Sequence, residues 1–552
     1  MREWLDRARQ ALAEPDPTAT KAAEWLLDND HLVQRAVVQI AQDLPPGFYA
    51  RLPVPANPEA EGLPRILFIS HSLLQATRLQ LSLSSAIEYV NAYQEDAYLT
   101  IAELWALPTM LRLACLELLV VALGRLVPRL APPFEATPPA MEPPSVEDTE
   151  CVARAIANLG LIDSIQWKDF FDRTSQVEAI LGRDAAGVYA HMDFETRDRY
   201  RKTVEELARH TTYAEHRIAE RVVEQTRRNA GGGKSHGHVG YWLVGGGLEA
   251  FERSIGYLPP LQASWGRWLR RHVAPLYAAA LFAATAVAVA LPALYLAATE
   301  AHPLPLALII GTTIALLPAS VVGLTLVHWL ATMILQPRLL PKLDFEKGIP
   351  PEYKTAVVVP TLLGSQEEAH ELLEKLEGHY LANPKGAVQF ALLSDYTDAP
   401  SERMPGDEGL VQILVDGIGR LNTRYGETGK GPFHLLHRPR LFNASEGCWM
   451  GWERKRGKLH ELNLLLRGAA DTSFIQTGQV PPERVRYVIA LDADSRLPPG
   501  AATRLVATMA HPLNRARVDG PLGRVVEGYG ILQPRVTAFL KAGGMSFFQR
   551  VF

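Results

Sequence analysis

The hydrophobic pattern of the first half of the chain is typical of α-helices. Between residues 1 and 270, apolar residues recur at helical spacing, and proline-rich stretches interrupt the pattern. The helical stretches include Ala22–Val33, Leu67–Val90 and Glu150–Ile162, and the proline-rich stretches are Pro45–Pro64 and Pro128–Pro144. The pattern predicts a mostly α-helical N-terminal region at residues 1–265. It opens on an amphipathic, charged helix rather than on a signal peptide.

Two long uncharged runs follow, at Val273–Thr299 and Leu304–Leu335, and a short turn separates them. Each exceeds the roughly 20 residues that cross a bilayer. We therefore expect a transmembrane helical hairpin within residues 266–340. A third apolar stretch, Leu111–Leu130, contains arginines and a glutamate, which favour a buried or membrane-surface helix instead.

Basic residues flank the hairpin on both outer sides, whereas the turn between the runs has no lysine or arginine. The flanking residues are Arg267, Arg270 and Arg271 on one side and Arg338 and Lys342 on the other. By the positive-inside rule, both flanks are cytoplasmic. We thus predict a multi-pass protein of a bacterial-type inner membrane, with the N-terminal region and the C-terminal domain in the cytoplasm. Trp265, Trp268 and Trp329 fit interfacial anchors, and a core role fits any one of them equally well.

After residue 350 the pattern changes to short β-branched runs alternating with helical stretches, which is typical of an α/β fold. Thr355–Pro360 is a predicted strand, and Gln366–Tyr380 has the spacing of a helix. A second strand, Ala387–Leu393, ends in Ser394 and Asp395, and a third begins at Tyr487. The order predicts a Rossmann-like sheet.

The predicted strands end in polar residues that point to one site. Pro360 and Thr361 end the first strand, Asp395 follows the second, and Asp492 and Asp494 form a D-x-D motif after the third. Ligands of open α/β sheets bind at the carboxyl ends of strands, and paired carboxylates suit Mg²⁺ or Mn²⁺. Such a cation neutralises a diphosphate leaving group. Taken alone, however, D-x-D is a weak motif that also occurs in ordinary turns.

A basic cluster leads into a helical run at residues 452–468, with the sequence WERKRGKLHELNLLLRG. We expect the Gly457–Lys458 step to open the helix, so that backbone N–H groups, Lys455 and Lys458 meet a diphosphate. The alternative is a solvated helix start, as charge runs usually are. Four leucines, Leu459, Leu462, Leu465 and Leu466, lie on roughly one face of this helix.

Composition excludes a few classes of function. The net charge of −4 says little about partners, and the basic clusters have no interleaved aromatic residues, so nucleic acid is not expected. Cys115, Cys151 and Cys448 form no C-x-x-C pair, which fits reduced thiols.

The GGGKS run at residues 231–235 lacks the first glycine of a phosphate-binding loop and is interpreted as a linker. His236 and His238 are interpreted as linker or packing residues.

Several motifs together support a family resemblance. VVVPT, LLSD, GKLHELN and ALDADS occur in that order, and the chain also contains YLTIAELWALPTMLRL, GVYAHMDFETRDRYR and HVGYWL. These runs resemble the GT-A glycosyltransferase core of processive inverting enzymes, and in detail the chain is similar to cyclic β-1,2-glucan synthases. The resemblance covers most of the chain and is far more specific than D-x-D alone.

The resemblance implies a membrane enzyme that transfers glucose from cytosolic UDP-glucose to a β-1,2-glucan acceptor. Residues 350–552 would form the GT-A domain, with Pro360 and Thr361 near uracil, Asp395 on the nucleoside and Mg²⁺ or Mn²⁺ on the D-x-D pair. Members of this family are much longer, so this domain is expected to be truncated. We expect the general base beyond Phe552, because Asp519 and Glu527 lack the family's context. The chain alone is then expected to bind the donor without turnover.

Two other functions fit parts of the pattern. A haloacid-dehalogenase-like phosphohydrolase uses a D-x-D strand to supply an aspartyl nucleophile and an acid. In that fold the motif follows the first strand, whereas here two strands precede it. The second alternative is a non-catalytic membrane fragment that only binds a nucleotide sugar.

Overall fold

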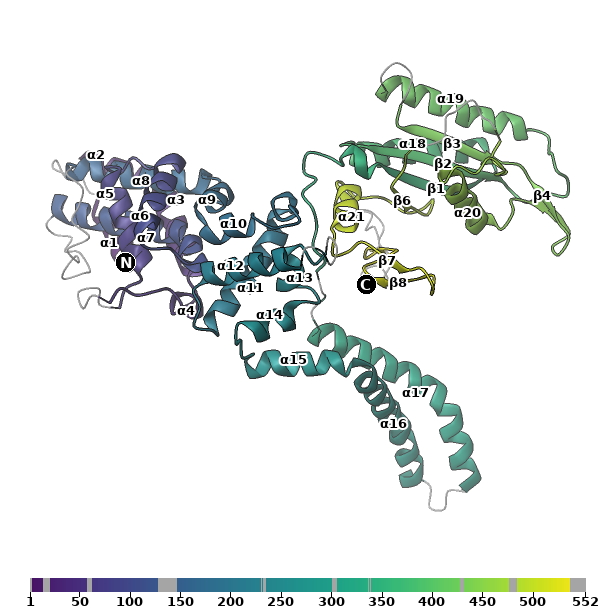
Figure 1. Ribbon diagram of the computed structural model, residues 1–552, viewed down its shortest axis with the longest axis horizontal. Coiled ribbons are helices and arrows are strands. Elements are labelled where there is room, and N and C mark those ends of the chain that lie inside the picture. The colour runs from purple at the N-terminus through teal and green to yellow at the C-terminus, as the bar shows by residue number, and fades with distance from the viewer. Residues whose placement is uncertain are drawn as a thin grey trace. The chain divides into compact units, whose positions relative to one another are not determined.

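The computed structural model divides the chain into two compact units, Met1–Ile255 and Gly256–Phe552. Figure 1 shows the helices and strands of both units. The structure describes residues 2–12, 20–56, 62–127, 146–229, 231, 235–299, 305–335, 337, 339–426, 431–475 and 484–536. Most of the GGGKS run lies outside the described residues.

The described part of the first unit consists of helices and their connections, as the spacing of apolar residues predicts. In chain order the helices are α1 (Arg2–Leu12), α2 (Thr20–Asp28), α3 (Asp30–Asp43), α4 (Pro46–Tyr49), α5 (Arg65–Ala76), α6 (Leu83–Asp96), α7 (Ile101–Leu126), α8 (Asp148–Ser164), α9 (Trp167–Thr174), α10 (Gln176–Leu181), a 3₁₀ turn (Tyr189–His191), α11 (Phe194–Arg209), α12 (Glu215–Arg228), α13 (Val239–Leu243) and α14 (Leu248–Ser254).

Helix α7 forms the core of this unit. It is long and apolar enough to cross a membrane, but 78% of its apolar window is buried within the unit. Its charged residues have partners, because Arg112 donates to Asp163 at 2.9 Å and Glu117 contacts His71 at 2.8 Å. This burial favours the core helix that the charges in the sequence predicted over a third membrane span.

The second unit begins with α15 (Leu261–Arg271) and the two helices of the apolar hairpin, α16 (Val273–Thr299) and α17 (Pro305–Ile334). Both hairpin helices are long and apolar enough to cross a membrane, and 0% and 11% of their apolar windows are buried. They pack closely, since a Cβ atom on Gly323 would lie 2.8 Å from Thr285 Oγ1. Such apolar exposure suggests association with a membrane.

The remainder of the unit is built around a four-stranded parallel sheet in the order β3-β2-β1-β6. Its strands are β1 (Thr355–Leu363), β2 (Val388–Tyr396), β3 (Phe433–Arg438) and β6 (Tyr487–Ala490), and its helices are α18 (Gln366–Ala382), α19 (Asp407–Tyr425), α20 (Arg454–Leu466) and α21 (Ala501–Ala510). A 3₁₀ turn (Pro351–Tyr353) precedes β1, and two small antiparallel pairs join β4 (Leu441–Asn443) to β5 (Cys448–Met450) and β7 (Arg517–Asp519) to β8 (Arg524–Glu527).

The three strands expected from the sequence are present, and β3 is an additional one. The strands β1, β2 and β3 are buried almost throughout, as continuous apolar runs in a parallel sheet should be. Helix α20 covers one face, where Leu462 packs with Val358 and Leu393. The other predicted leucines of α20 pack against the same cluster, which confirms the predicted apolar face. Tyr380 of α18 contacts the opposite face through Phe390 and Phe433.

Candidate functional site

The carboxyl ends of the four parallel strands meet at one edge of the sheet. Leu362, next to Thr361, is in register with Asp395, and Asp395 is in register with Arg438. The β6 strand joins the same edge, because the Leu491 N–H donates to the Val358 carbonyl at 2.9 Å, one residue before Asp492. The structure therefore brings the predicted strand tips together.

Asp395 lies in a buried ion pair rather than on the surface. Its two carboxylate oxygens accept hydrogen bonds from Arg438 Nε and Nη2, each at 2.8 Å. Lys458 Nζ lies 3.2 Å from Asp395 Oδ2. The loop above also covers the carboxylate, since a Cβ atom on Gly451 would lie 2.3 Å from Oδ2. The contact between Asp395 and a nucleoside stays a prediction. In this structure the carboxylate pairs with the Arg438 guanidinium and the Lys458 ammonium.

Arg438 is a site residue that the sequence reasoning missed. Besides Asp395, its guanidinium donates to Glu461 Oε1 at 3.2 Å and to the backbone carbonyls of Trp452 at 3.0 Å and Arg454 at 3.2 Å. It is 1% exposed, so these bonds form away from water. The sequence signal that could have identified Arg438 is its position as the last residue of the strand FHLLHR. Arg438 thus ties the tips of β2 and β3 to the loop that begins α20.

The start of α20 differs from the prediction. The helix begins at Arg454. Both Glu453, just before the helix, and Arg454 adopt the left-handed backbone region, with φ of 52° and 45°. The predicted opening at Gly457 and Lys458 is wrong, because the Gly457 N–H already donates to the Glu453 carbonyl at 3.0 Å. Gly457 has another role: a Cβ atom there would lie 2.0 Å from the Trp452 carbonyl oxygen. The helix turns so tightly on its preceding loop that only glycine fits.

The two lysines of the cluster occupy different environments. Lys458 is buried, and its ammonium donates to the Thr361 carbonyl while pairing with Asp395. Burial lowers the pKa of Lys458 from its ordinary value, and the Asp395 carboxylate opposes this effect. Lys455 is exposed and forms an ion pair with Asp492. Lys455 can therefore reach a ligand at the surface, whereas Lys458 ties β1 and β2 to α20.

The D-x-D carboxylates lie in an exposed turn directly after β6, where the Ser495 N–H donates to the Asp492 carbonyl at 2.9 Å. Asp492 already attracts one cation, Lys455. Within the described part of the chain, no hydrogen bond or ion pair of Asp494 is seen. Two accessible carboxylates are a donor set that Mg²⁺ or Mn²⁺ accepts. The chemistry of the residues fits the predicted metal, and its binding stays a prediction.

Pro360 and Thr361 are both buried at the end of β1. The Thr361 hydroxyl donates to the Leu362 carbonyl at 3.1 Å, and its own carbonyl accepts from Lys458. Neither side chain projects freely from the tip, so a base would meet this strand end chiefly through exposed Leu362 and the backbone.

A second polar layer below the tips was also missed. His437 is buried on β3, and its Nδ1 lies 2.8 Å from Ser394 Oγ. Burial lowers the pKa of His437 to about 4, although the Asp395 carboxylate opposes this effect. The imidazole is therefore neutral at neutral pH. The adjacent Arg440 pairs with Asp407 at 2.6 Å.

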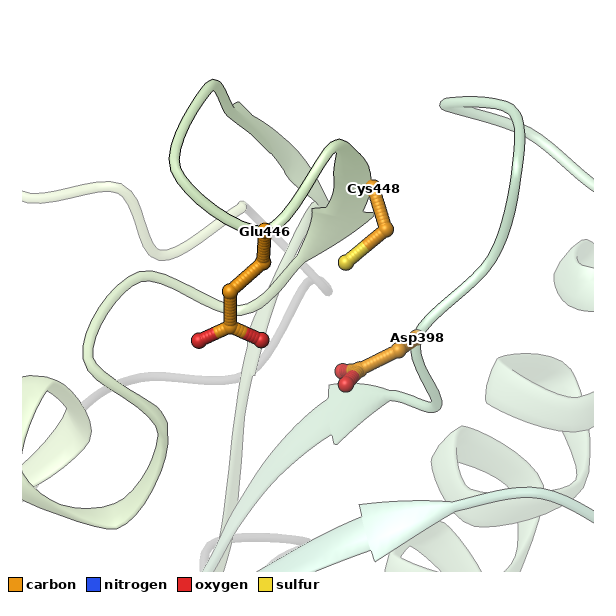
Figure 2. A group of neighbouring side chains, drawn as sticks. All are labelled: Asp398, Glu446 and Cys448. Atoms are coloured by element: carbon orange, nitrogen blue, oxygen red, sulfur yellow. The ribbon is translucent and has the colours of Figure 1, made fainter.

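Asp398, Glu446 and Cys448 form a second group that could hold a metal, with ligand atoms within 4.8 Å of one another. Figure 2 shows Asp398, on a loop after β2, facing Glu446 and Cys448 of the β4–β5 hairpin. Arg454 Nη2, however, lies 2.8 Å from Asp398 Oδ2 and 3.2 Å from Glu446 Oε2. Because the guanidinium already pairs with both carboxylates, this group is better described as an exposed ion-pair cluster.

The chain was compared with known proteins by sequence. No family model matches it. It is 34% identical over 624 aligned positions to the protein named cyclic beta-(1,2)-glucan synthase NdvB of Rhizobium meliloti (strain 1021). The alignment covers 99% of this chain and 22% of that protein. The similarity therefore extends over both units, while the chain spans less than a quarter of the relative's length.

Proposed function

Because the chain is a relative of the cyclic β-(1,2)-glucan synthase family, we propose that it transfers glucose from UDP-glucose to a growing β-1,2-glucan with inversion at the anomeric carbon. The observation that carries the proposal is the 34% identity over 99% of the chain. The parallel sheet with an exposed D-x-D turn at its carboxyl edge supports a donor site there. The exposed apolar hairpin supports the proposed location in the inner membrane, with the transferase domain cytoplasmic.

In the proposed site, Asp492 and Asp494 would hold Mg²⁺ or Mn²⁺, which when bound would neutralise the diphosphate of the leaving UDP. Lys455 now balances the charge of Asp492. A divalent cation would replace the lysine as the partner of Asp492, and the ammonium would become available for the diphosphate. The backbone at Pro360 and Thr361 would lie near the uracil.

Asp395 acts in this proposal as a positioning residue. Both of its oxygens are engaged by Arg438, so it contributes by holding Arg438 and Lys458 in place. Arg438 in turn donates to the carbonyls of Trp452 and Arg454, so Asp395 also helps to hold the first turn of α20, which carries Lys455. In this proposal the donor binds at the exposed edge of the sheet, where Lys455 and Asp492 lie, and the buried ion pairs hold that edge in place.

No general base is assigned. Asp519 accepts from the Leu522 N–H at 3.2 Å, and Glu527 pairs with Arg517 at 2.9 Å, both within the β7–β8 hairpin. An expected base beyond Phe552 stays a prediction. The donor-binding half of the proposal can be tested without it.

The phosphohydrolase alternative is weakened by the sheet topology. In that class the nucleophilic aspartate follows the first strand of the domain, whereas β1 ends at Leu363 and is followed by Gly364 and Ser365. The D-x-D motif follows β6, which is at one end of the sheet order. The observations favour a donor site over an aspartyl nucleophile.

A UDP-binding titration with Mn²⁺ tests the proposal. Asp492→Asn and Asp494→Asn each remove an anionic ligand from an exposed turn, so the fold should persist. We expect each to weaken Mn²⁺-dependent UDP binding by roughly 100-fold or more. Asp416→Asn is the matched control, because Asp416 is exposed on α19, where it accepts from Gln412 at 2.8 Å. UDP affinity that is the same in all three variants and the parent would overturn the assignment.

A further inference from the structure

The short helix α15 (Leu261–Arg271), just before the hairpin, exposes large apolar side chains. Leu261 is 89% exposed, Trp265 is 65% exposed and Trp268 is 43% exposed. Leu258, immediately before the helix, is 80% exposed. Tryptophan seldom stays so accessible in water without a partner surface. This face therefore needs an occupant.

The exposed residues form a single stripe. Leu261, Trp265 and Trp268 are spaced four and three residues apart, which places them on one face of a helix. The indoles of Trp265 and Trp268 stack, with ring centroids 5.0 Å apart and an interplanar angle of 23°. The stripe is thus a continuous aromatic and aliphatic surface.

Arginines occupy other sides of α15. At about 100° per residue, Arg270 lies opposite the apolar stripe, and Arg267 and Arg271 lie toward one flank of it. The sequence contains no aspartate or glutamate from Leu258 to Thr299. A helix with an arginine-rich face and a tryptophan-rich face matches the surface of an anionic lipid leaflet, which offers phosphate groups above an apolar layer.

The position of α15 in the chain identifies the surface. Only His272 separates it from α16 (Val273–Thr299), and the backbone there has φ −111° and ψ 23°, which interrupts the helix. Figure 1 shows the bend between α15 and α16. None of the apolar window of α16 is buried. If α16 crosses a bilayer, α15 begins at the level of its headgroups, where tryptophan prefers to lie.

We propose that α15 lies in the interface of the bilayer that α16 and α17 cross, and that it binds anionic phospholipid there. Its leucine and tryptophan stripe enters the boundary of the acyl chains, and its arginines contact the headgroup phosphates. The helix thereby fixes the angle at which the chain leaves the membrane. This proposal does not depend on the transferase activity.

The test uses the full chain in lipid nanodiscs of phosphatidylcholine, with or without phosphatidylglycerol. An environment-sensitive fluorophore is attached to the cysteine of Trp265→Cys. Cys448→Ser removes the accessible native thiol, and Cys115 and Cys151 are buried. We expect blue-shifted emission and quenching by spin-labelled lipid, both stronger with phosphatidylglycerol. Leu381→Cys is the matched control, because Leu381 is an exposed apolar residue of α18. It should show neither change.

A charge reversal tests the anionic preference separately. Arg270→Glu should lower the lipid-quenched population at position 265 by about fivefold or more in phosphatidylglycerol nanodiscs. Arg420→Glu changes an exposed arginine of α19 and should leave this population unchanged. A blue shift at position 265 without lipid quenching would mean that protein, from this chain or a second copy, covers the stripe, and would overturn the proposal. If the quenching at position 265 were the same with and without phosphatidylglycerol, and the same in Arg270→Glu, the proposed binding of anionic phospholipid would be overturned.

Discussion

Each of the two units buries a cluster of paired charges, but the clusters differ in what their cations contact. In the first unit, Arg201 is fully buried and donates to Glu178 at 2.6 Å. In the second, Arg438 is buried and pairs with Asp395 and Glu461. Both clusters remove guanidinium groups from water, which is costly unless the partners are retained.

Arg201 also approaches Asp172 and Asp198, at 3.7 Å and 3.6 Å, and it contacts two aromatic rings. Its guanidinium lies over the rings of Phe171 and Phe194, at 4.6 Å and 4.8 Å from their centroids. Glu178 also accepts from Tyr189 at 2.8 Å and from Arg197. The cluster therefore joins α9, α10 and α11 into one packed region. Its role is to hold these three helices together.

The cations of the second cluster also contact backbone carbonyls at the rim of the sheet. Arg438 donates to the carbonyls of Trp452 and Arg454, and Lys458 donates to that of Thr361. These segments surround the exposed pair of Lys455 and Asp492. Similar buried charges thus stabilise packing in one unit and position a surface in the other.

The strongest test of this comparison replaces one arginine in each unit. Arg201→Met and Arg438→Met each remove one of the two cations that a buried carboxylate holds, because Arg197 still pairs with Glu178 and Lys458 with Asp395. Each should lower the free energy of unfolding of its unit by about 3 kcal/mol. Hydrogen-exchange protection of each unit measures this loss. The units should differ in a second readout, because Arg438→Met should also weaken Mn²⁺-dependent UDP binding and Arg201→Met should not.

Asp198→Asn is the control for Arg201, because Asp198 approaches Arg201 only at 3.6 Å and its loss should be small. Equal effects of Arg201→Met and Arg438→Met on UDP binding, at a temperature where both units stay folded, would contradict the distinction between packing and positioning.

A smaller change tests the rim alone. Gly457→Ala places a methyl group against the Trp452 carbonyl, so the loop before α20 must move. We expect a loss of up to about 3 kcal/mol in stability and weaker UDP binding, because Lys455 is displaced. Gly378→Ala in α18 is the matched control: no atom lies within 4 Å of its Cβ position, and it should stabilise the helix by about 0.5–1 kcal/mol. Unchanged UDP binding in Gly457→Ala would show that the loop is not part of the site.

The sequence was sufficient for elements whose signal is local. The apolar runs of β1, β2 and β6 and the two hairpin helices are long or regular enough to be recognised from their periodicity. The strand β3 was missed because its apolar core, Leu435–Leu436, is short and lies between histidines. Burial within the sheet, rather than local propensity, makes this segment a strand.

The candidate site was predicted less completely than the fold. The sequence identified the carboxylates at the strand tips, but it could not distinguish buried Asp395 from exposed Asp492, since both simply follow apolar runs. The difference depends on Arg438, which lies 43 residues from Asp395. The start of α20 was misplaced for a similar reason, because left-handed Glu453 and Arg454 have no sequence signature.

The two units should also respond differently to pH. Burial raises the pKa of Glu215 in the first unit to about 7, although it accepts a hydrogen bond from the Ile101 N–H at 2.7 Å. In the second unit burial raises the pKa of Asp407, but hydrogen bonds from Arg440 and Met404 outweigh it and hold the pKa below its ordinary value. One carboxyl group therefore favours the protonated form in its folded unit, and the other favours the ionised form.

The signs follow from proton linkage. For Glu215 the folded pKa is raised, so its stabilisation is fully present below the unfolded pKa and is lost as the pH rises through about 7. For Asp407 the folded pKa is lowered, so its contribution is present above the unfolded pKa and is lost only as the pH falls through the folded pKa. Between pH 5 and 8, Glu215 should thus lower the stability of the first unit by about 2 kcal/mol, and Asp407 should leave the second unchanged.

Hydrogen-exchange protection of each unit at pH 5 and pH 8 measures both effects in one sample. Glu215→Gln should remove the part of the pH dependence that Glu215 contributes to the first unit, because glutamine accepts the Ile101 hydrogen bond without titrating. Asp407→Asn should destabilise the second unit equally at both pH values, because the Arg440 partner is ionised throughout. If Glu215→Gln retained the full loss of protection at pH 8, another group in the first unit would be responsible. The contrast between a carboxyl group held by a backbone N–H and one paired with arginine would then not explain the response.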